Sequence, residues 1–534
     1  MKTNLLTKIS GIFFCLLIIN ASATAQVTRT WVYDYNPPNN LNAKGSCLIH
    51  LQSGVTITGG DYTNSNSSSR YNILVIANDS GNLISVDTST LGFGYSKIIS
   101  DGNSACYALA ALQNDSSSAR NILVAKIDSA TYNIRFFVPD SSSSIYYDQS
   151  DMILLSNGKL LVGSRMENFP LIRLALTCLD TTGNIVWQVV DSTFEIKYDL
   201  KLLADASGGF FAAGSGRDTS TSEDFIFISH FNASGSRDWF VRQNSPALFF
   251  ADFLDLIKDN DDFLWLSGIV MDSAGQVGVL MKLDTIGNIL WNHTVSPMPY
   301  LNLLCDQNNN IYGTTVPANG IDVFTIDKLN TLGYPINTNA FQLPGYFTSI
   351  LSDIKIIPGG LIAATGELFV WAFPKSDLYL AVFDTMLSLV GYDIYDSLNL
   401  FGESGRAISI GTNDQLYVCG RINYENQLET SNLGVIKYQL NLINTIQEKA
   451  YSPYIEIAPN PSSGNFNIHW KNLPEGKTTF CIFNSIGELL FEDNLHLQEG
   501  WKNYSQKLPD GVLFIRIESK SLLLNKKILV INSY

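Results

Sequence analysis

The chain has 534 residues, more than one hydrophobic core usually organises, so we expect one large domain and at least one smaller one. Its formal net charge is −15 at pH 7, and an acidic surface of this kind repels phosphate backbones, which excludes nucleic acid as an expected partner. Charged residues make up only 16% of the chain and aromatic residues 11%, a composition typical of a β-rich extracellular protein.

The first 25 residues have the pattern of a secretory signal peptide. Lys2 and Lys8 give a basic start, and the apolar run over residues 9–19 is too short to predict a transmembrane span. An Ala-x-Ala site ends at Ala25, so we expect cleavage between Ala25 and Gln26. No later stretch is long and apolar enough to predict a transmembrane segment.

The chain then repeats itself. The segment LDTTGNIVW at residues 179–187 recurs as LDTIGNILW at 283–291 and, more weakly, as FNASGSRDW at 231–239. The three copies begin 52 residues apart, and a fixed interval of this size indicates a repeat architecture. Weaker copies of the same anchor lie 46 to 54 residues apart, at Asn78, Asp128, Asn330 and Asp384.

A second turn signal lies upstream in each unit, between two apolar runs. It occurs eight times, at Gly54, Gly102, Gly158, Gly208, Asp261, Asn309, Gly360 and Asp414. Each unit can be divided into four short strands, and Asn-Gly or Asp-Gly turns between apolar runs favour hairpins. Four strands in roughly 50 residues, repeated, predict an all-β fold with a seven- or eight-bladed β-propeller over residues 26–441. An open solenoid or two separate sandwiches is the alternative architecture.

The Asp-x-x-Gly-x-x-x-Trp ending of these units resembles the repeats of quinoprotein-like and kelch-like propellers. The resemblance implies that Trp187, Trp239 and Trp291 pack between adjacent blades. Stacking of a ligand on these rings is the competing interpretation.

The sequence contains few of the patterns that mark catalytic sites. The five histidines have no metal-ligand spacing, and the chain has neither a Gly-x-Ser-x-Gly elbow nor a phosphate-binding loop. The six cysteines after residue 25 form no Cys-x-x-Cys pair, which argues against a zinc site and favours buried thiols, with one long-range disulfide left open. No cofactor is expected, with calcium as the one alternative.

The calcium alternative rests on an acidic segment. Asp259, Asp261 and Asp262 offer carboxylate oxygens of the kind that calcium prefers, but the segment lacks the glycine and the distal glutamate of an EF-hand loop. A solvated hairpin turn is the favoured interpretation. Aspartates are frequent enough in the repeats to supply a pair of carboxylates for glycoside hydrolysis, but no spacing selects a pair.

The last residues carry four motifs in order. They read APNPSSGNF (458–466), FNSIGELL (483–490), LPDGVLFIRI (508–517) and KKILV (526–530). Turns separate alternating apolar runs, which predicts a small antiparallel β-sandwich over residues 452–534, joined to the repeats by a linker at 442–451. The series resembles the type A C-terminal sorting domain of the type IX secretion system, and the matching positions are Pro459, Asn460, Pro461, Gly464, Gly487, Gly511, Lys526 and Lys527.

That resemblance implies recognition by the type IX translocon of a Gram-negative bacterium. It also implies export through the periplasm to the outer-membrane surface or the medium. We therefore expect a non-catalytic surface or secreted propeller whose loops bind a glycan or protein ligand. The alternative is a secreted polysaccharide hydrolase with carboxylates in the propeller channel.

Overall fold

The computed structural model describes residues 24–36, 42–63, 69–88, 92–103, 105–113, 120–137, 146–168, 171–245, 250–272, 275–295, 298–315, 323–370, 375–397, 402–425, 430–443, 454–458, 462, 465–471, 478–485, 487–495, 500–505, 508–519 and 522–530. Every regular element in these ranges is a β-strand, and they contain no helix long and apolar enough to cross a membrane. Strands β1–β32 belong to one compact unit and β33–β39 to a second.

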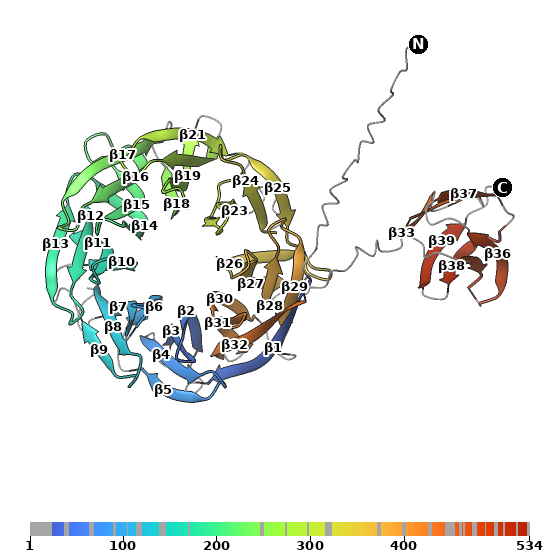
Figure 1. Ribbon diagram of the computed structural model, residues 1–534, viewed down its shortest axis with the longest axis horizontal. Coiled ribbons are helices and arrows are strands. Elements are labelled where there is room, and N and C mark those ends of the chain that lie inside the picture. The colour runs from blue at the N-terminus through green and yellow to red at the C-terminus, as the bar shows by residue number, and fades with distance from the viewer. Residues whose placement is uncertain are drawn as a thin grey trace, which may run out of the picture. The chain divides into compact units, whose positions relative to one another are not determined.

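The larger unit is a β-propeller, and Figure 1 shows its blades arranged around a central axis. Blade 1 contains β2 (Asn42–Leu51), β3 (Val55–Thr63), β4 (Arg70–Asn78) and β5 (Leu83–Asp87), and blade 2 contains β6 (Gly92–Ser100), β7 (Ala105–Gln113), β8 (Arg120–Asp128) and β9 (Ile134–Phe137). Blade 3 contains β10 (Tyr146–Leu154), β11 (Leu160–Asn168), β12 (Leu171–Leu179) and β13 (Ile185–Asp191). Blade 4 contains β14 (Glu195–Ala204), β15 (Phe210–Arg217), β16 (Asp224–Phe231) and β17 (Arg237–Asn244).

Blade 5 contains β18 (Ala251–Lys258), β19 (Leu264–Asp272), β20 (Gly275–Leu283) and β21 (Ile289–Val295), and blade 6 contains β22 (Asn302–Cys305), β23 (Ile311–Thr315), β24 (Thr325–Leu329) and β25 (Pro335–Ala340). Blade 7 contains β26 (Thr348–Ile356), β27 (Ile362–Phe369), β28 (Ser376–Phe383) and β29 (Leu389–Tyr395). Blade 8 contains β30 (Ser404–Ile410), β31 (Gln415–Glu425) and β32 (Thr430–Ile443), together with β1 (Thr24–Tyr35). The described strands thus make eight blades, which selects eight from the predicted seven or eight.

The first strand of the chain completes the last blade. Strand β1 pairs antiparallel with β32, from Thr24 opposite Ile443 to Tyr35 opposite Leu433. Blade 8 therefore takes three strands from the end of the repeat region and its outermost strand from the beginning. The predicted cleavage site falls within β1, where Ala25 pairs with Leu442 and Gln26 with Asn441.

The repeated anchor residue shapes the turn between the third and fourth strands of a blade. In blade 3, Asp180 Oδ1 accepts hydrogen bonds from the amides of Thr182 (2.8 Å) and Asn184 (2.9 Å). Gly183 follows with a φ of 92°, a left-handed conformation that favours glycine. The same side-chain-to-amide bond, four residues along, recurs at Asn78, Asn232, Asp284, Asn330 and Asp384. These polar residues therefore hold turns, as Asp and Asn commonly do.

The repeated tryptophans join each blade to the next. Trp187 donates its indole N–H to the carbonyl of Ala233 in the next blade (3.1 Å), and Trp239 does the same to Thr285 (3.2 Å). A Cβ atom built on Gly235 would lie 2.8 Å from the Trp187 ring, so the indole packs directly on the turn. This placement supports the packing role expected of these side chains.

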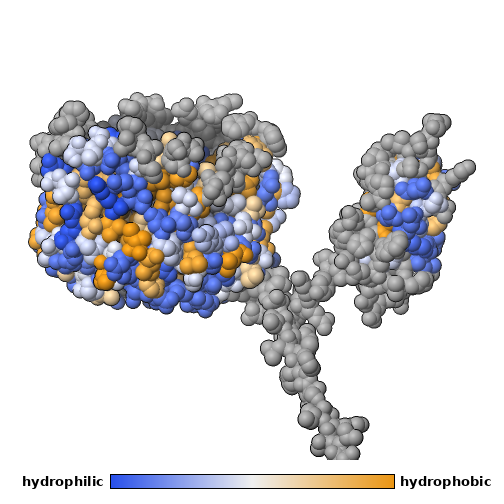
Figure 2. Space-filling view, turned by 90° about the horizontal axis from the view of Figure 1, so that it is seen from above, coloured by the Kyte–Doolittle hydropathy of each residue, from blue (hydrophilic) through white to orange (hydrophobic). Residues whose placement is uncertain are grey.

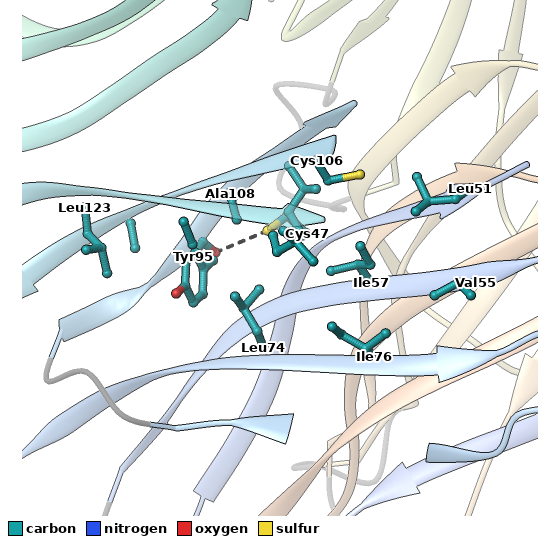
Figure 3. Packing of buried hydrophobic residues seen from close by; sticks show 14 residues of the cluster. Cys47, Leu51, Val55, Ile57, Leu74, Ile76, Tyr95, Cys106, Ala108 and Leu123 are labelled. Atoms are coloured by element: carbon teal, nitrogen blue, oxygen red, sulfur yellow. Dashed lines mark hydrogen bonds between the residues drawn. The ribbon is translucent and has the colours of Figure 1, made fainter. Parts of the chain in front are cut away.

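Cores of apolar side chains lie between neighbouring blades. Figure 3 shows the one between blades 1 and 2, where the Cys47 thiol donates to the carbonyl of Tyr95 (3.5 Å). Burial raises the pKa of Cys47 to about 12 and that of Cys106 to about 11, so both thiols stay protonated at neutral pH. The six cysteines within the described ranges are all free thiols.

The smaller unit is a sandwich of two antiparallel sheets. One contains β33 (Tyr454–Ala458), β34 (Asn465–Lys471) and β37 (Gly500–Ser505); the other contains β35 (Thr478–Phe483), β36 (Leu489–Leu495), β38 (Gly511–Ser519) and β39 (Leu522–Val530). Phe466, Phe480 and Ile515 are among the side chains buried between the sheets. The fold agrees with the small sandwich predicted for the tail.

Candidate functional site

The inner strands carry carboxylates, as a hydrolase site in the channel would require. Asp151, Asp255 and Asp353 occupy equivalent positions just after a bulge in β10, β18 and β26. Each accepts a hydrogen bond of 2.7 Å from a backbone amide of the next blade, at Leu202, Leu303 and Ile408 respectively.

Lysines strengthen two of these links. Lys97 in blade 2 pairs with Asp151 in blade 3, and Lys201 in blade 4 pairs with Asp255 in blade 5. The second oxygen of Asp255 also accepts from its neighbour's amide, at Leu256 (2.9 Å). These carboxylates fasten blades to one another. No motif marks these four residues in the sequence; their one shared signal is the interval of 50 to 54 residues that separates Lys97, Asp151, Lys201 and Asp255.

We expect Asp255→Ala to lower the free energy of unfolding by about 3 kcal/mol, because it leaves buried amides of two blades without an acceptor and Lys201 without its partner. Asp238→Ala is the matched control, since that side chain is 44% exposed, and its loss should cost at most about 1 kcal/mol. Urea unfolding of both variants measures the difference. Equal urea midpoints for the two variants would show that the Asp255 link between blades contributes nothing to the free energy of unfolding.

The acidic segment proposed for calcium lies in the hairpin between β18 and β19. Asp259 is buried and accepts from the Trp265 indole (2.8 Å), from Lys282 (3.1 Å) and from the amides of Asp261 and Phe263. The Asp261 carboxylate accepts from Asn309 (2.6 Å), and that of Asp262 pairs with Lys258 (2.7 Å). Across the described ranges, no three His, Cys, Asp or Glu side chains are grouped so as to hold a metal ion.

The described strands of blade 6 are the shortest of any blade, and a cavity lies at its side. Strands β22, β23 and β24 have four, five and five residues, whereas β18, β19 and β20 of blade 5 have eight, nine and nine. The cavity has a volume of about 450 Å³, within the range of small-molecule sites. Its lining comprises His293, Thr294, Val295, Met298, Tyr300, Thr315, Thr325, Asp327, Gly333, Tyr334, Pro335 and Thr338.

Three aromatic rings are stacked beside the cavity, and two of them, His293 and Tyr334, line it. The His293 ring lies 4.7 Å from Tyr334 at an interplanar angle of 8°, and 4.8 Å from Trp291 on β21 at 24°. Burial lowers the pKa of His293, so its ring is uncharged at pH 7 and stacks on its neighbours as a neutral imidazole. The Tyr334 side chain remains 53% exposed although its ring is fixed by this stack.

A hydrogen-bonded carboxylate forms the polar side of the same cavity. Asp327 on β24 accepts from the Tyr300 hydroxyl (3.0 Å) and from the Thr338 hydroxyl (2.6 Å), one at each oxygen. Burial, together with the charge of Asp327, raises the pKa of Tyr300, so the phenol stays protonated and continues to donate. The carboxylate is thereby held in one orientation. No sequence pattern pointed to Asp327 or Tyr334, because the lining comes from four separate segments.

Two other cavities are smaller and more polar. One, of about 330 Å³, lies between blades 2 and 3 and is lined by Lys126, Asp128, Arg135 and Thr181 among others. The other, of about 270 Å³, is lined by His50, Ser100 and Asn103 among others. Neither joins a fixed, exposed aromatic ring to an oriented acceptor as the cavity beside blade 6 does.

A buried carboxyl group in blade 8 makes stability depend on pH. Glu403 lies between β29 and β30, is fully buried, and accepts from the Ser397 hydroxyl. Burial raises its pKa from 4.5 to about 7. The folded protein therefore binds this proton more tightly than the unfolded chain. Its contribution favours folding below about pH 4.5 and is lost as pH rises through about 7.

We expect Glu403→Gln to remove this dependence, because glutamine keeps the shape without the ionisation. Relative to the variant, the wild type should lose stability between about pH 4.5 and 7, by roughly 3 kcal/mol at most. Chemical unfolding at half-unit steps of pH measures both slopes. Parallel curves of unfolding free energy against pH for the wild type and the variant would contradict the assignment of this pH dependence to Glu403.

The residues of the sorting motifs fall partly within the described ranges. Gly487 and Gly511 have φ values of 83° and 124°; Gly487 lies just before β36, and Gly511 is the first residue of β38. Lys526 and Lys527 lie in β39, opposite Ile515 and Phe514. Pro459, Asn460, Pro461 and Gly464 lie outside the described residues.

Comparisons with known proteins bear on each unit separately. Residues 456–531 match the family described as the secretion system C-terminal sorting domain. No curated protein matches the sequence.

Solved structures resemble the fold at low identity. Chaetomium thermophilum Sqt1 bound to the N-terminus of the ribosomal protein L10 has 8% identity and a TM-score of 0.46, with 76% of this chain and 98% of that chain covered. The β-propeller domain of the Trilobed protease from Pyrococcus furiosus has 11% identity and a TM-score of 0.38, with 77% and 99% covered. A polysaccharide lyase of family PL25, an ulvan lyase, has 10% identity and a TM-score of 0.42, with 76% and 95% covered.

The family match gives the chain's destination. A sorting domain of this kind is recognised by the type IX secretion system and directs export to the cell surface or the extracellular space. The chain thus carries an all-β propeller of eight blades, followed by a type IX C-terminal sorting domain.

Proposed function

We propose that this protein is an exported, non-catalytic β-propeller that binds an extracellular ligand in the cavity between blades 5 and 6. The observation that carries the proposal is the pairing, within one cavity of about 450 Å³, of the exposed Tyr334 ring with the fixed Asp327 carboxylate. Binding pockets commonly combine an apolar surface with a few placed polar groups. The sorting domain supports a ligand found outside the cell.

The character of the lining supports binding over hydrolysis. Glycoside hydrolysis generally needs two carboxyl groups on either side of the bond that breaks. Among the described lining residues, Asp327 is the one carboxylate, and His293 is held by its stack. The channel aspartates that the hydrolase alternative would use, such as Asp151 and Asp255, are occupied by lysines and backbone amides.

A thermal-shift screen of the secreted full chain tests this proposal. The library holds saccharides, short peptides and small amines, and each stabilising compound is measured again on Tyr334→Ala. Tyr392→Ala is the control, because Tyr392 is an exposed tyrosine on β29 (48%) outside the cavity lining. We expect the stabilisation to vanish in Tyr334→Ala and to persist in Tyr392→Ala, with the compound recovered intact. Turnover of the compound, or equal stabilisation of all three proteins, would overturn the proposal.

A further inference from the structure

From the chemistry of this cavity, and resting on the function proposed above, we infer that the ligand is a neutral saccharide. One sugar ring stacks on Tyr334, and its hydroxyl groups donate hydrogen bonds to Asp327. Four features of the described lining lead to this class of ligand: a flat platform, an acceptor with free capacity, the absence of cationic groups and the burial of the second tyrosine.

The platform is a single aromatic face. His293 covers one side of the Tyr334 ring at 4.7 Å and nearly parallel, and Trp291 supports His293 in turn. With Tyr334 53% exposed, the ring keeps surface free for a ligand. The negative face of an aromatic ring attracts weakly positive C–H groups, and the axial C–H groups of a pyranose form such a flat, polarised patch. The fixed ring also lowers the entropy cost of stacking.

The acceptor has room for a ligand. A carboxylate offers about four lone-pair sites, and Asp327 uses one for Tyr300 and one for Thr338. Two sites therefore remain, on a side chain that is 8% exposed and held in place. Sugar hydroxyls are donors of the required kind, and the Thr325 hydroxyl, which donates to the carbonyl of Thr315 (3.5 Å), can still accept a hydrogen bond within the same lining.

Charge excludes acidic sugars and phosphorylated ligands. The described lining holds the carboxylate of Asp327 and neither lysine nor arginine. An anionic ligand would be repelled there, since binding of carboxylates and phosphates relies on cationic side chains. Neutral, hydroxyl-rich ligands meet no such penalty.

A cationic ligand is the closest competitor, because aromatic rings and a carboxylate also bind quaternary amines. Such sites surround the cation with several open aromatic faces. Here Tyr300 is 1% exposed and serves as a donor to Asp327, so Tyr334 offers the exposed phenol face alone. A single exposed ring beside a carboxylate with free lone pairs fits one face of a sugar better than it fits a cation, which is usually surrounded by several open rings.

Saturation-transfer NMR and calorimetry on the secreted full chain test this inference. The neutral probes are cellobiose, maltose, xylobiose and mannobiose; digalacturonate and choline are the charged comparators. We expect at least one neutral disaccharide to bind. Its affinity should fall about tenfold or more in Tyr334→Ala, stay within about threefold in Tyr334→Trp, and remain unchanged in Tyr392→Ala. Asp327→Asn should also weaken it, since one acceptor oxygen becomes a donor.

The outcomes separate this inference from the proposed function. Choline or digalacturonate bound through Tyr334, with no neutral sugar bound, would overturn the ligand class and leave the cavity as a binding site. A disaccharide bound equally by wild type and Tyr334→Ala would overturn the assignment of the sugar to this platform. If none of the probes bound, the saccharide class would be overturned. The thermal-shift screen of the wider library would then test whether the cavity binds a ligand of another class.

Discussion

Deletion of residues 26–35, which removes most of β1, should leave the propeller without a stable fold. The deletion takes away most of the outermost strand of blade 8 and exposes the edge of β32 from Leu433 to Asn441. It also removes Trp31, whose indole N–H donates to the carbonyl of Asp79 in blade 1 (2.8 Å). We expect aggregation or a collapse of the melting temperature, measured by calorimetry. A synthetic peptide of residues 26–35 should restore the transition by strand addition.

Point variants make the same test within a complete chain. Trp31→Ala should cost about 3 kcal/mol, because the ring packs on Gly81, where a built Cβ atom would lie 3.0 Å from it. Val32→Ala is the matched control, since Val32 is the next residue of the strand and is 36% exposed. It should cost less than about 1 kcal/mol. A truncated protein that melts like the wild type would show that β1 does not complete the propeller.

Loss of the sorting domain should abolish export. A chain truncated after residue 451 should accumulate in the periplasm, because the translocon would have no sorting domain to recognise. Cell fractionation followed by immunoblotting measures the distribution. Ile515→Asp in the full chain should behave in the same way, since it places a charge in the core of the sandwich, where Ile515 is 1% exposed. Ile515→Val should be exported normally.

The periplasmic propeller serves as the control for that experiment. Because β1–β32 form a compact unit of their own, the truncated protein should melt at the temperature of the full chain's propeller. Appearance of the truncated chain in the medium at wild-type levels would contradict the role of the tail in export.

The repeat could be predicted because a local rule recurs in it. Asp180, Asn232 and Asp284 each fold the amides of the following residues around a side-chain oxygen, so the same residue types appear at each turn. The turn needs only an Asp or Asn and the four residues that follow it in the sequence. It therefore survives as a visible pattern even where the strands between the turns have diverged.

The strand that completes blade 8 could not be predicted in this way. Its partner β32 lies about 400 residues along the chain, and such a pairing leaves no local signature. One signal was present in hindsight, because Trp31 occupies the role of Trp187 and Trp239 and packs on the turn of the following blade. Without a turn residue before it, this copy of the motif carried only the tryptophan.

The cavity was hidden for a related reason. It lies beside blade 6, which differs in the sequence only in the 46 residues between Asp284 and Asn330, against 50 to 52 between earlier anchors. The acidic segment at Asp259 is the opposite case, because its sequence signal is strong. In that conspicuous cluster of carboxylates, Asp259 accepts from Trp265 and Lys282 within a hairpin, whereas the less conspicuous Asp327 lines a cavity.

We propose that the ligand site of the exported protein is the cavity between blades 5 and 6. A crystal structure of the secreted chain soaked with its best-binding disaccharide tests this most directly. We predict density for a sugar ring parallel to Tyr334, with a hydroxyl within hydrogen-bonding distance of the Asp327 carboxylate. An empty cavity, with the saccharide ordered elsewhere on the propeller, would contradict the claim.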